Sequence, residues 1–124
     1  MALKSAQNDG DGSMTLCQIN NYIGITLDRL KDHEKAMGYY QAAMQVAEKH
    51  NDNDAVLQLM ANIVKSYIEL KKPNEALAFM GSIPKKFLEA EKDESYIYTP
   101  LSYLIIHNEL KNYAAVSSYI NHII

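Results

Sequence analysis

One two-residue phrase returns three times in this chain of 124 residues, always with the same offset. Leu30-Lys31 recurs as Leu70-Lys71 and again as Leu110-Lys111, so each copy lies 40 residues after the one before it. A small apolar residue and then a larger one follow each phrase at the same offset, at Ala36 and Tyr40, Ala76 and Met80, and Val116 and Ile120. A fixed period of this length is typical of stacked repeat folds, which usually act by presenting a surface rather than a catalytic pocket.

Apolar residues recur at intervals of three and four along the chain, which is the periodicity of an α-helix. We expect helices over 16–30, 35–47, 56–70, from Pro73 to about 83, over 85–91, from Thr99 as N-cap with Pro100 as first residue, and from Asn112 as N-cap. No segment alternates with the two-residue period of a half-buried strand. The sequence therefore predicts an all-α fold of antiparallel helix–turn–helix hairpins joined by short turns.

The breaks between these segments have residues suited to helix ends. Residues 51–54 are Asn-Asp-Asn-Asp, whose side chains accept hydrogen bonds from free backbone amides at a helix start. Pro73 suits a first turn because its missing N–H is no loss there. Pro84, close after Gly81, predicts a kink or a short break, since proline removes a helical hydrogen bond.

The pattern of small and large residues resembles that of the tetratricopeptide repeat. In the first unit the five matching places are held by Gly24, Leu27, Ala36, Tyr40 and Ala43. The second unit keeps Tyr67 and Ala76 but has bulkier residues at Val64, Met80 and Ile83, and the third is a degenerate copy with Leu104, His107, Val116, Ile120 and Ile123. The resemblance implies a right-handed superhelical stack of hairpins, and the long period is similar to the long-helix subclass of signalling adaptors and peptide-sensing regulators.

On this basis the chain is a single domain over 1–124, divided into units over 14–53, 54–93 and 94–124, the last truncated. Residues 1–12 are expected to be the tail of a preceding repeat, because Ala2–Asp11 resembles Ala43–Asp52. We therefore expect an excerpt of a longer repeat protein, and the alternative is a complete small protein with a frayed tail. Unpaired terminal helices would favour self-association, especially through Val116, Tyr119, Ile120 and Ile123.

The resemblance also implies a concave groove, lined by the first helix of each unit, that binds a peptide. The positions expected to line it are Gln18, Asn21, Ile25, Asp28 and Arg29 in the first unit, Gln58, Ala61, Asn62, Lys65 and Glu69 in the second, and Tyr98, Leu101, Ser102 and Ile105 in the third. Amide side chains can pair with both the donors and the acceptors of a peptide backbone, and Arg29 and Lys65 can hold a carboxylate. The alternative is that Asn21 and Asn62 face water or bind a neighbouring helix.

Other classes of function have little in the sequence to favour them. The net charge of −3, with both signs interspersed, lacks the basic face that nucleic acid requires. No run of 18 apolar residues predicts a membrane span, and no signal peptide opens the chain, so a cytoplasmic location is the default. No two histidines have zinc-ligand spacing, Cys17 has no adjacent base, and no glycine-rich phosphate loop occurs, so we expect no metal, no cofactor and no catalytic residues.

The sequence therefore predicts a non-enzymatic module that binds a protein or peptide segment, within a larger signalling or regulatory protein. The alternative is a domain that senses a peptide or small ligand and controls an attached DNA-binding or catalytic domain. The sequence names neither the partner nor the pathway, and it fixes neither the length of the full array nor the native oligomeric state.

Overall fold

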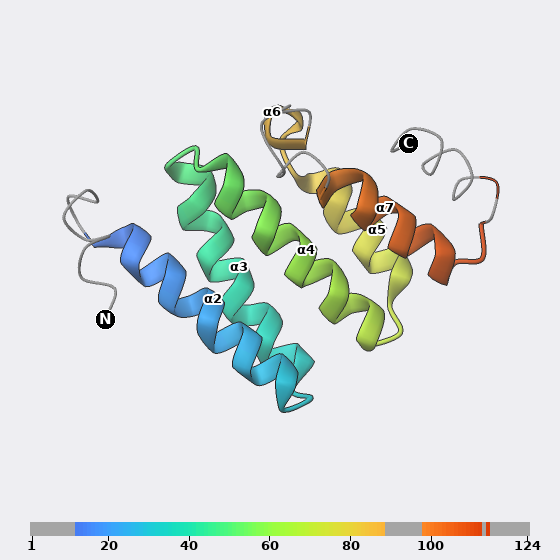
Figure 1. Cartoon of the computed structure of the whole chain (residues 1–124), viewed down its shortest axis with the longest axis horizontal. Helices are drawn as coiled ribbons and strands as arrows, with labels where there is room; N and C mark the ends of the chain where they lie inside the picture. Colours follow the sequence, from blue (N-terminus) through green and yellow to red (C-terminus); the bar gives the residue numbers. More distant parts are fainter. Residues whose placement is uncertain (1–11, 89–97, 113, 115–124) are drawn as a thin grey trace.

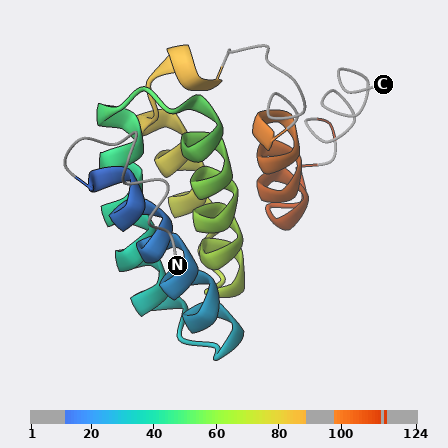
Figure 2. The same cartoon turned by 60° about the vertical axis from the view of Figure 1, so that its left-hand side comes forward.

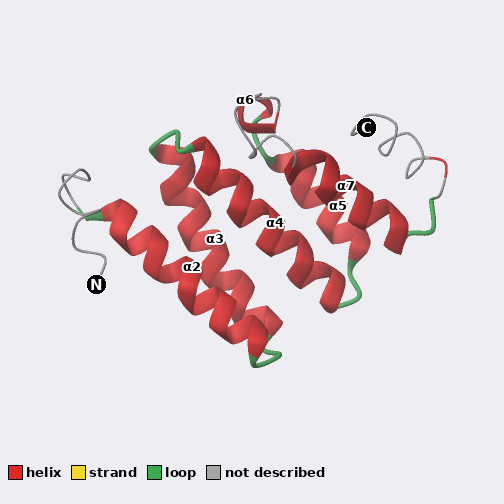
Figure 3. Cartoon of the chain, viewed as in Figure 1, coloured by secondary structure: helices red, strands yellow, loops and turns green. Residues whose placement is uncertain are grey.

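The computed structural model describes residues 12–88, 98–112 and 114, and every regular element in these ranges is a helix (Figures 1 and 3). The helices are α2 (Ser13–Arg29), α3 (His33–Lys49), α4 (Asn53–Glu69), α5 (Pro73–Ser82), α6 (Lys85–Leu88) and α7 (Tyr98–Glu109). The all-α prediction is confirmed for this part of the chain.

Successive helices from α2 to α5 pack against one another. α3 contacts both α2 and α4, and α4 contacts α5 and α7 (Figures 1 and 2). α2 also contacts α4 directly, and α7 contacts α5. Consecutive long helices run in opposite directions and are joined by short turns, as the sequence predicts (Figure 1).

The repeated Leu-Lys phrase forms a helix end. Among the residues that the structure describes, four that are not glycine have a positive φ, and each follows the end of a long helix: Lys31, Asn51, Lys71 and Lys111. After α2, the Lys31 N–H donates to the Asp28 carbonyl over 3.0 Å and the Asp32 N–H donates to the Leu27 carbonyl over 2.9 Å. This pair of bonds is the Schellman motif, which needs a left-handed residue where Lys31 lies.

The expected starts and breaks of the second hairpin are also present. Asp52 is the N-cap of α4, and its side chain accepts a hydrogen bond of 3.2 Å from the Ala55 N–H. Pro73 is the first residue of α5. Ile83 has an extended backbone, with φ −78° and ψ 131°, because a residue that precedes proline is driven out of the helical region. Pro84 therefore separates α5 from the short helix α6.

The start of α7 differs from the predicted one. α7 begins at Tyr98, so the prediction that Thr99 caps it is wrong. Threonine and proline both fit inside a first turn, where backbone N–H groups have no partner within the helix. The predicted tail over 1–12, the end of the 85–91 helix and the final helix with Val116 lie, apart from Gly12, outside the described residues.

The core is continuous from α3 through α4. Val56, Leu57, Met60 and Ile63 of α4 are completely buried. On α3 the buried residues that face neighbouring helices include Ala36, Ala43 and Ala47, whose small side chains let helices approach closely. Phe87 is also buried, so α6 packs onto this core.

Gly24 marks a close approach of α2 and α3 in the first hairpin. A Cβ atom built at Gly24 would lie 2.5 Å from the ring of Tyr40, which is itself only 1% exposed. Only glycine leaves room for this ring, so the Tyr40 side chain lies directly on the backbone of α2. The packing fixes α2 against α3.

Candidate functional site

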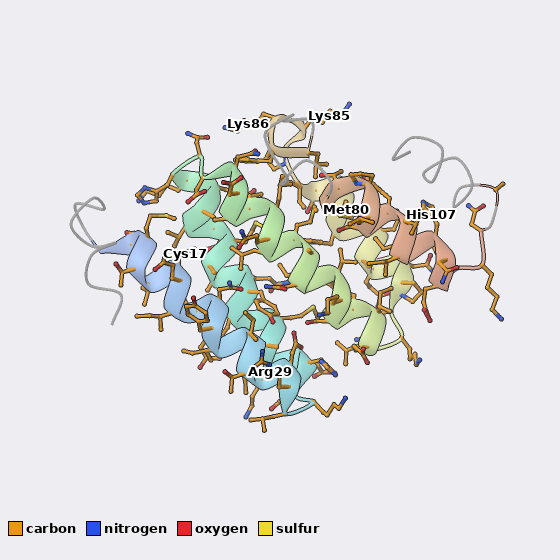
Figure 4. All side chains as sticks on the ribbon, in the orientation of Figure 1. Cys17, Arg29, Met80, Lys85, Lys86 and His107 are labelled. Carbon is orange, nitrogen blue, oxygen red and sulfur yellow. The ribbon has the colours of Figure 1, made fainter. Side chains whose placement is uncertain are left out.

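Three hollows lie in a row between α2 and α4. The cap hollow, named for the Asp52 N-cap at its edge, has a volume of about 290 Å³. The middle hollow has a volume of about 240 Å³. The turn hollow, beside the turn from α2 to α3, has a volume of about 180 Å³. In Figure 4, Cys17 and Arg29 mark the two ends of this row along α2.

All ten groove positions predicted on α2 and α4 line these hollows. The cap and middle hollows contain Gln18, Asn21, Ile25, Gln58, Ala61 and Asn62, and the turn hollow contains Asp28, Arg29, Lys65 and Glu69. Residues spaced by three and four along a helix lie on one face of it, and two such faces meet here. We call this surface the α2–α4 face.

The predicted positions on α7 are placed differently. Leu101 and Ile105 are exposed but line none of the three hollows. Ser102 is 2% exposed, so its hydroxyl is not available to a partner. The side chain of Tyr98 lies outside the described residues. The α2–α4 face is therefore built from the first two units alone.

The middle hollow contains an amide pair that joins the two helices. The Asn62 side chain donates from Nδ2 to Oδ1 of Asn21 over 3.0 Å. The sequence allowed two roles for Asn21 and Asn62, a peptide contact or a bond to a neighbouring helix, and this contact is of the second kind. A side-chain amide has two donor hydrogens and an acceptor oxygen, so one bond leaves each amide with capacity for others. Both side chains are half-buried and also line the middle hollow.

Asp28 is the centre of a network that joins three helices. Its carboxylate accepts from the Tyr40 hydroxyl over 2.7 Å and from the Ser66 hydroxyl over 2.9 and 3.0 Å, one distance to each oxygen. Nδ1 of His33 lies 2.7 Å from the same carboxylate. We call these four residues the Asp28 network; they come from α2, α3 and α4. The sequence places Asp28 in the groove but gives no sign of Ser66, which is 38 residues away.

The Asp28 network is not arranged as a nucleophile with its base. The Ser66 hydroxyl lies within hydrogen-bonding distance of Asp28 and of the Asn62 carbonyl, the latter at 3.1 Å. An activated serine instead directs its proton to a base such as histidine, which a third group orients. The geometry here fixes the positions of side chains across helices.

Burial changes the acidity of Tyr40. Loss of water around the phenol is the largest cause that raises its pKa, followed by the hydrogen bond to Asp28 and the negative charge of that carboxylate. All three favour the neutral hydroxyl over the phenolate. Tyr40 therefore remains a donor to Asp28 well beyond neutral pH.

The Cys17 thiol is part of the packing between α2 and α3. The buried thiol of Cys17 donates to the Ala43 carbonyl over 3.3 Å.

In the described ranges, no three His, Cys, Asp or Glu side chains converge as metal ligands would. None of the helices that the structure describes combines the length and the apolar character that crossing a bilayer needs.

Comparison of the chain with protein-family models, with curated proteins and with solved structures gives no match. The geometry of the α2–α4 face is therefore the basis for a functional proposal.

Proposed function

We propose that this chain is a non-enzymatic, tetratricopeptide-like module that binds an extended protein or peptide segment along the α2–α4 face. One observation carries the proposal. Ten positions chosen by the resemblance, on helices 40 residues apart in sequence, line three adjoining hollows. A chance selection of helix positions would scatter over several faces.

The chemistry of the face suits a peptide backbone. Gln18 and Gln58 are exposed, and the Asn21–Asn62 pair lies beside them. Amide groups can donate to carbonyls and accept from N–H groups, so they can bind a chain without selecting one sequence. Ile25 and Ala61 supply apolar surface in the middle hollow, which favours exclusion of water from bonds formed there.

The close contact of Gly24 with Tyr40 supports the resemblance itself. The repeat pattern has a small residue on the first helix where the two helices of a unit meet, and a large residue on the second. In the first unit these two residues touch. We propose that the units stack as a superhelix in the same family arrangement.

Selection from a displayed library of random peptides tests the proposal. A selected peptide should shift the NMR signals of the Asn21 and Asn62 side-chain amides. Arg29→Ala combined with Gln58→Ala should weaken binding and leave thermal stability unchanged, because both side chains are exposed and line the hollows. Gln45→Ala combined with Lys49→Ala is the matched control, since both lie exposed on α3 outside the hollows.

Equal weakening by the two double variants would show that the peptide binds elsewhere. Failure of the library to yield any peptide that shifts α2 or α4 signals would refute the proposal. Asn62→Ala is less suitable as a test, because loss of its bond to Asn21 affects stability as well.

A further inference from the structure

The two ends of the α2–α4 face differ in charge. The cap hollow is lined by Asp52 and Asp54, and no lysine or arginine is among its lining residues. The turn hollow is lined by three cations, Arg29, Lys31 and Lys65, together with two carboxylates. The face therefore runs from an acidic end near the start of α4 to a basic end near its finish.

The two carboxylates of the turn hollow do not cancel its cations. Asp28 already has Tyr40, Ser66 and His33 as partners, and the three cations of the turn hollow outnumber its two carboxylates. Within the described residues neither Arg29 nor Lys65 forms an ion pair, and both are exposed. Glu69 is exposed as well, which leaves an excess of positive charge at this end.

The middle of the face is uncharged. Asn21, Ile25, Gln58, Ala61 and Asn62 line the middle hollow, and none of them is ionisable. The distance between the charged ends follows from helix geometry. Asp54 and Lys65 are eleven residues apart on α4, which corresponds to about 16 Å along the axis at about 1.5 Å per residue. An extended chain covers that distance in about five residues.

We infer that the segment bound by this face carries an acidic residue and a basic residue about five positions apart, with uncharged residues between them. Its carboxylate lies in the turn hollow beside Arg29 and Lys65, and its cation lies in the cap hollow beside Asp52 and Asp54. The inference rests on the proposed function and adds the charge pattern of the guest.

Complementary charges select partners as well as attract them. An entirely acidic segment would place a carboxylate against Asp52 and Asp54, and an entirely basic one would place a cation against Arg29 and Lys65. Like charges brought together weaken a complex. Each of these segments would therefore be attracted at one end of the face and repelled at the other, and its net affinity would be lower.

Charge variants of a library-selected peptide, blocked at both termini, test the inference by fluorescence anisotropy. Four versions share their central residues and differ at the two end positions: acid with base, two acids, two bases, and two glutamines. The acid-with-base version should bind most tightly. Replacement of either charged residue by glutamine should weaken binding by roughly 2- to 5-fold, as expected for an exposed ion pair. Added salt should reduce this difference.

Reversal of one charge on the protein gives the sharper result. Lys65→Glu replaces a cation of the turn hollow by a carboxylate, so both ends of the face are then acidic and the two-base peptide should overtake the acid-with-base peptide. Lys85→Glu is the matched control, because Lys85 is an exposed lysine on α6, remote from Arg29 in Figure 4, and lines none of the hollows. The control should keep the original order of affinities.

Each result bears on a different claim. Equal affinities for all four peptides, or an order that Lys65→Glu leaves unchanged, would overturn the charge pattern while the binding face stands. A library that yields no peptide for the α2–α4 face would overturn the proposed function and this inference together.

Discussion

The first hairpin, α2 with α3, and the second, α4 with α5, solve the same packing problem with different side chains. In the first, Gly24 meets the ring of Tyr40. Forty residues later the same places hold Val64 and Met80, and both are buried. A smallest-with-largest pair is thus replaced by two side chains of intermediate size. The corresponding places of the two hairpins are therefore filled by different combinations of side-chain size, and all four residues are buried.

The polar groups of the two hairpins differ as well. Asp28 and Tyr40 of the first hairpin correspond to Ile68 and Met80 of the second, so the bond from Tyr40 to Asp28 has no counterpart there. Thr26 and Ser66 correspond as well, and each hydroxyl bonds the carbonyl four residues earlier, over 2.9 and 3.1 Å. A side-chain hydrogen bond therefore supplements packing between α2 and α3, whereas the corresponding places on α4 and α5 hold the apolar residues Ile68 and Met80.

The largest expected change in stability comes from placing the residues of the second hairpin, valine and methionine, at positions 24 and 40 of the first. Gly24→Val forces a side chain into the Tyr40 ring and should destabilise the protein by roughly 1–3 kcal/mol in chemical denaturation. Adding Tyr40→Met, which recreates the Val–Met pair, should recover part of that loss. Gly38→Ala is the control, because a Cβ there meets nothing within 4 Å, and better helix propensity should stabilise by about 1 kcal/mol. No recovery in the double variant would contradict the equivalence of the pairs.

Removal of the carboxylate should have the next largest effect. Asp28→Ala leaves the buried Tyr40 hydroxyl without its acceptor, which should reduce the free energy of unfolding by about 1–3 kcal/mol. A double-mutant cycle with Tyr40→Phe measures the coupling, and the two changes together should destabilise less than their sum. Strict additivity would show that the bond contributes nothing of its own.

The next largest effect is a loss of stability at alkaline pH, which we expect because Tyr40 of the first hairpin has a raised pKa. The pKa of Tyr40 is raised in the folded protein above the value of about 10 expected when unfolded. Its contribution to stability is therefore complete below about pH 10 and is lost as the pH rises toward the folded pKa. Urea unfolding at increasing pH should show a steeper loss of stability in the wild type than in Tyr40→Phe. Parallel curves would mean that Tyr40 does not contribute to the pH dependence.

The smallest effect is expected at the helix ends. Lys71 has φ 61°, a conformation that glycine adopts without the strain of a side chain, so Lys71→Gly should stabilise by roughly 0.5–1 kcal/mol. Asn51→Gly should gain less, because asparagine tolerates this region well. Lys71→Ala serves as control, because alanine keeps the Cβ atom that strains a positive φ. A gain from Lys71→Ala equal to that from Lys71→Gly would refute this explanation.

Local features of this fold could be predicted from the sequence, and distant contacts could not. The stop after α2, the Asp52 cap and the break at Pro84 depend on residues a few positions apart, so their chemistry is visible in a short window. The ten face positions were predicted from the resemblance to the tetratricopeptide repeat, which assigns groove positions to the first helix of each unit. The bond from Ser66 to Asp28 joins residues 38 apart, and it forms only because α3 holds α2 and α4 at the required separation. The burial of Ser102 depends likewise on how α7 docks.

The lysines at the helix ends have an electrostatic consequence. Lys31, Lys71 and Lys111 each follow a helix C-terminus, where aligned peptide dipoles leave a partial negative charge. A cation there is favourable by roughly 0.3–1 kcal/mol, and this attraction offsets part of the left-handed strain. Salt screens the dipole and leaves the strain unchanged, so the turns of this protein are most secure at low ionic strength.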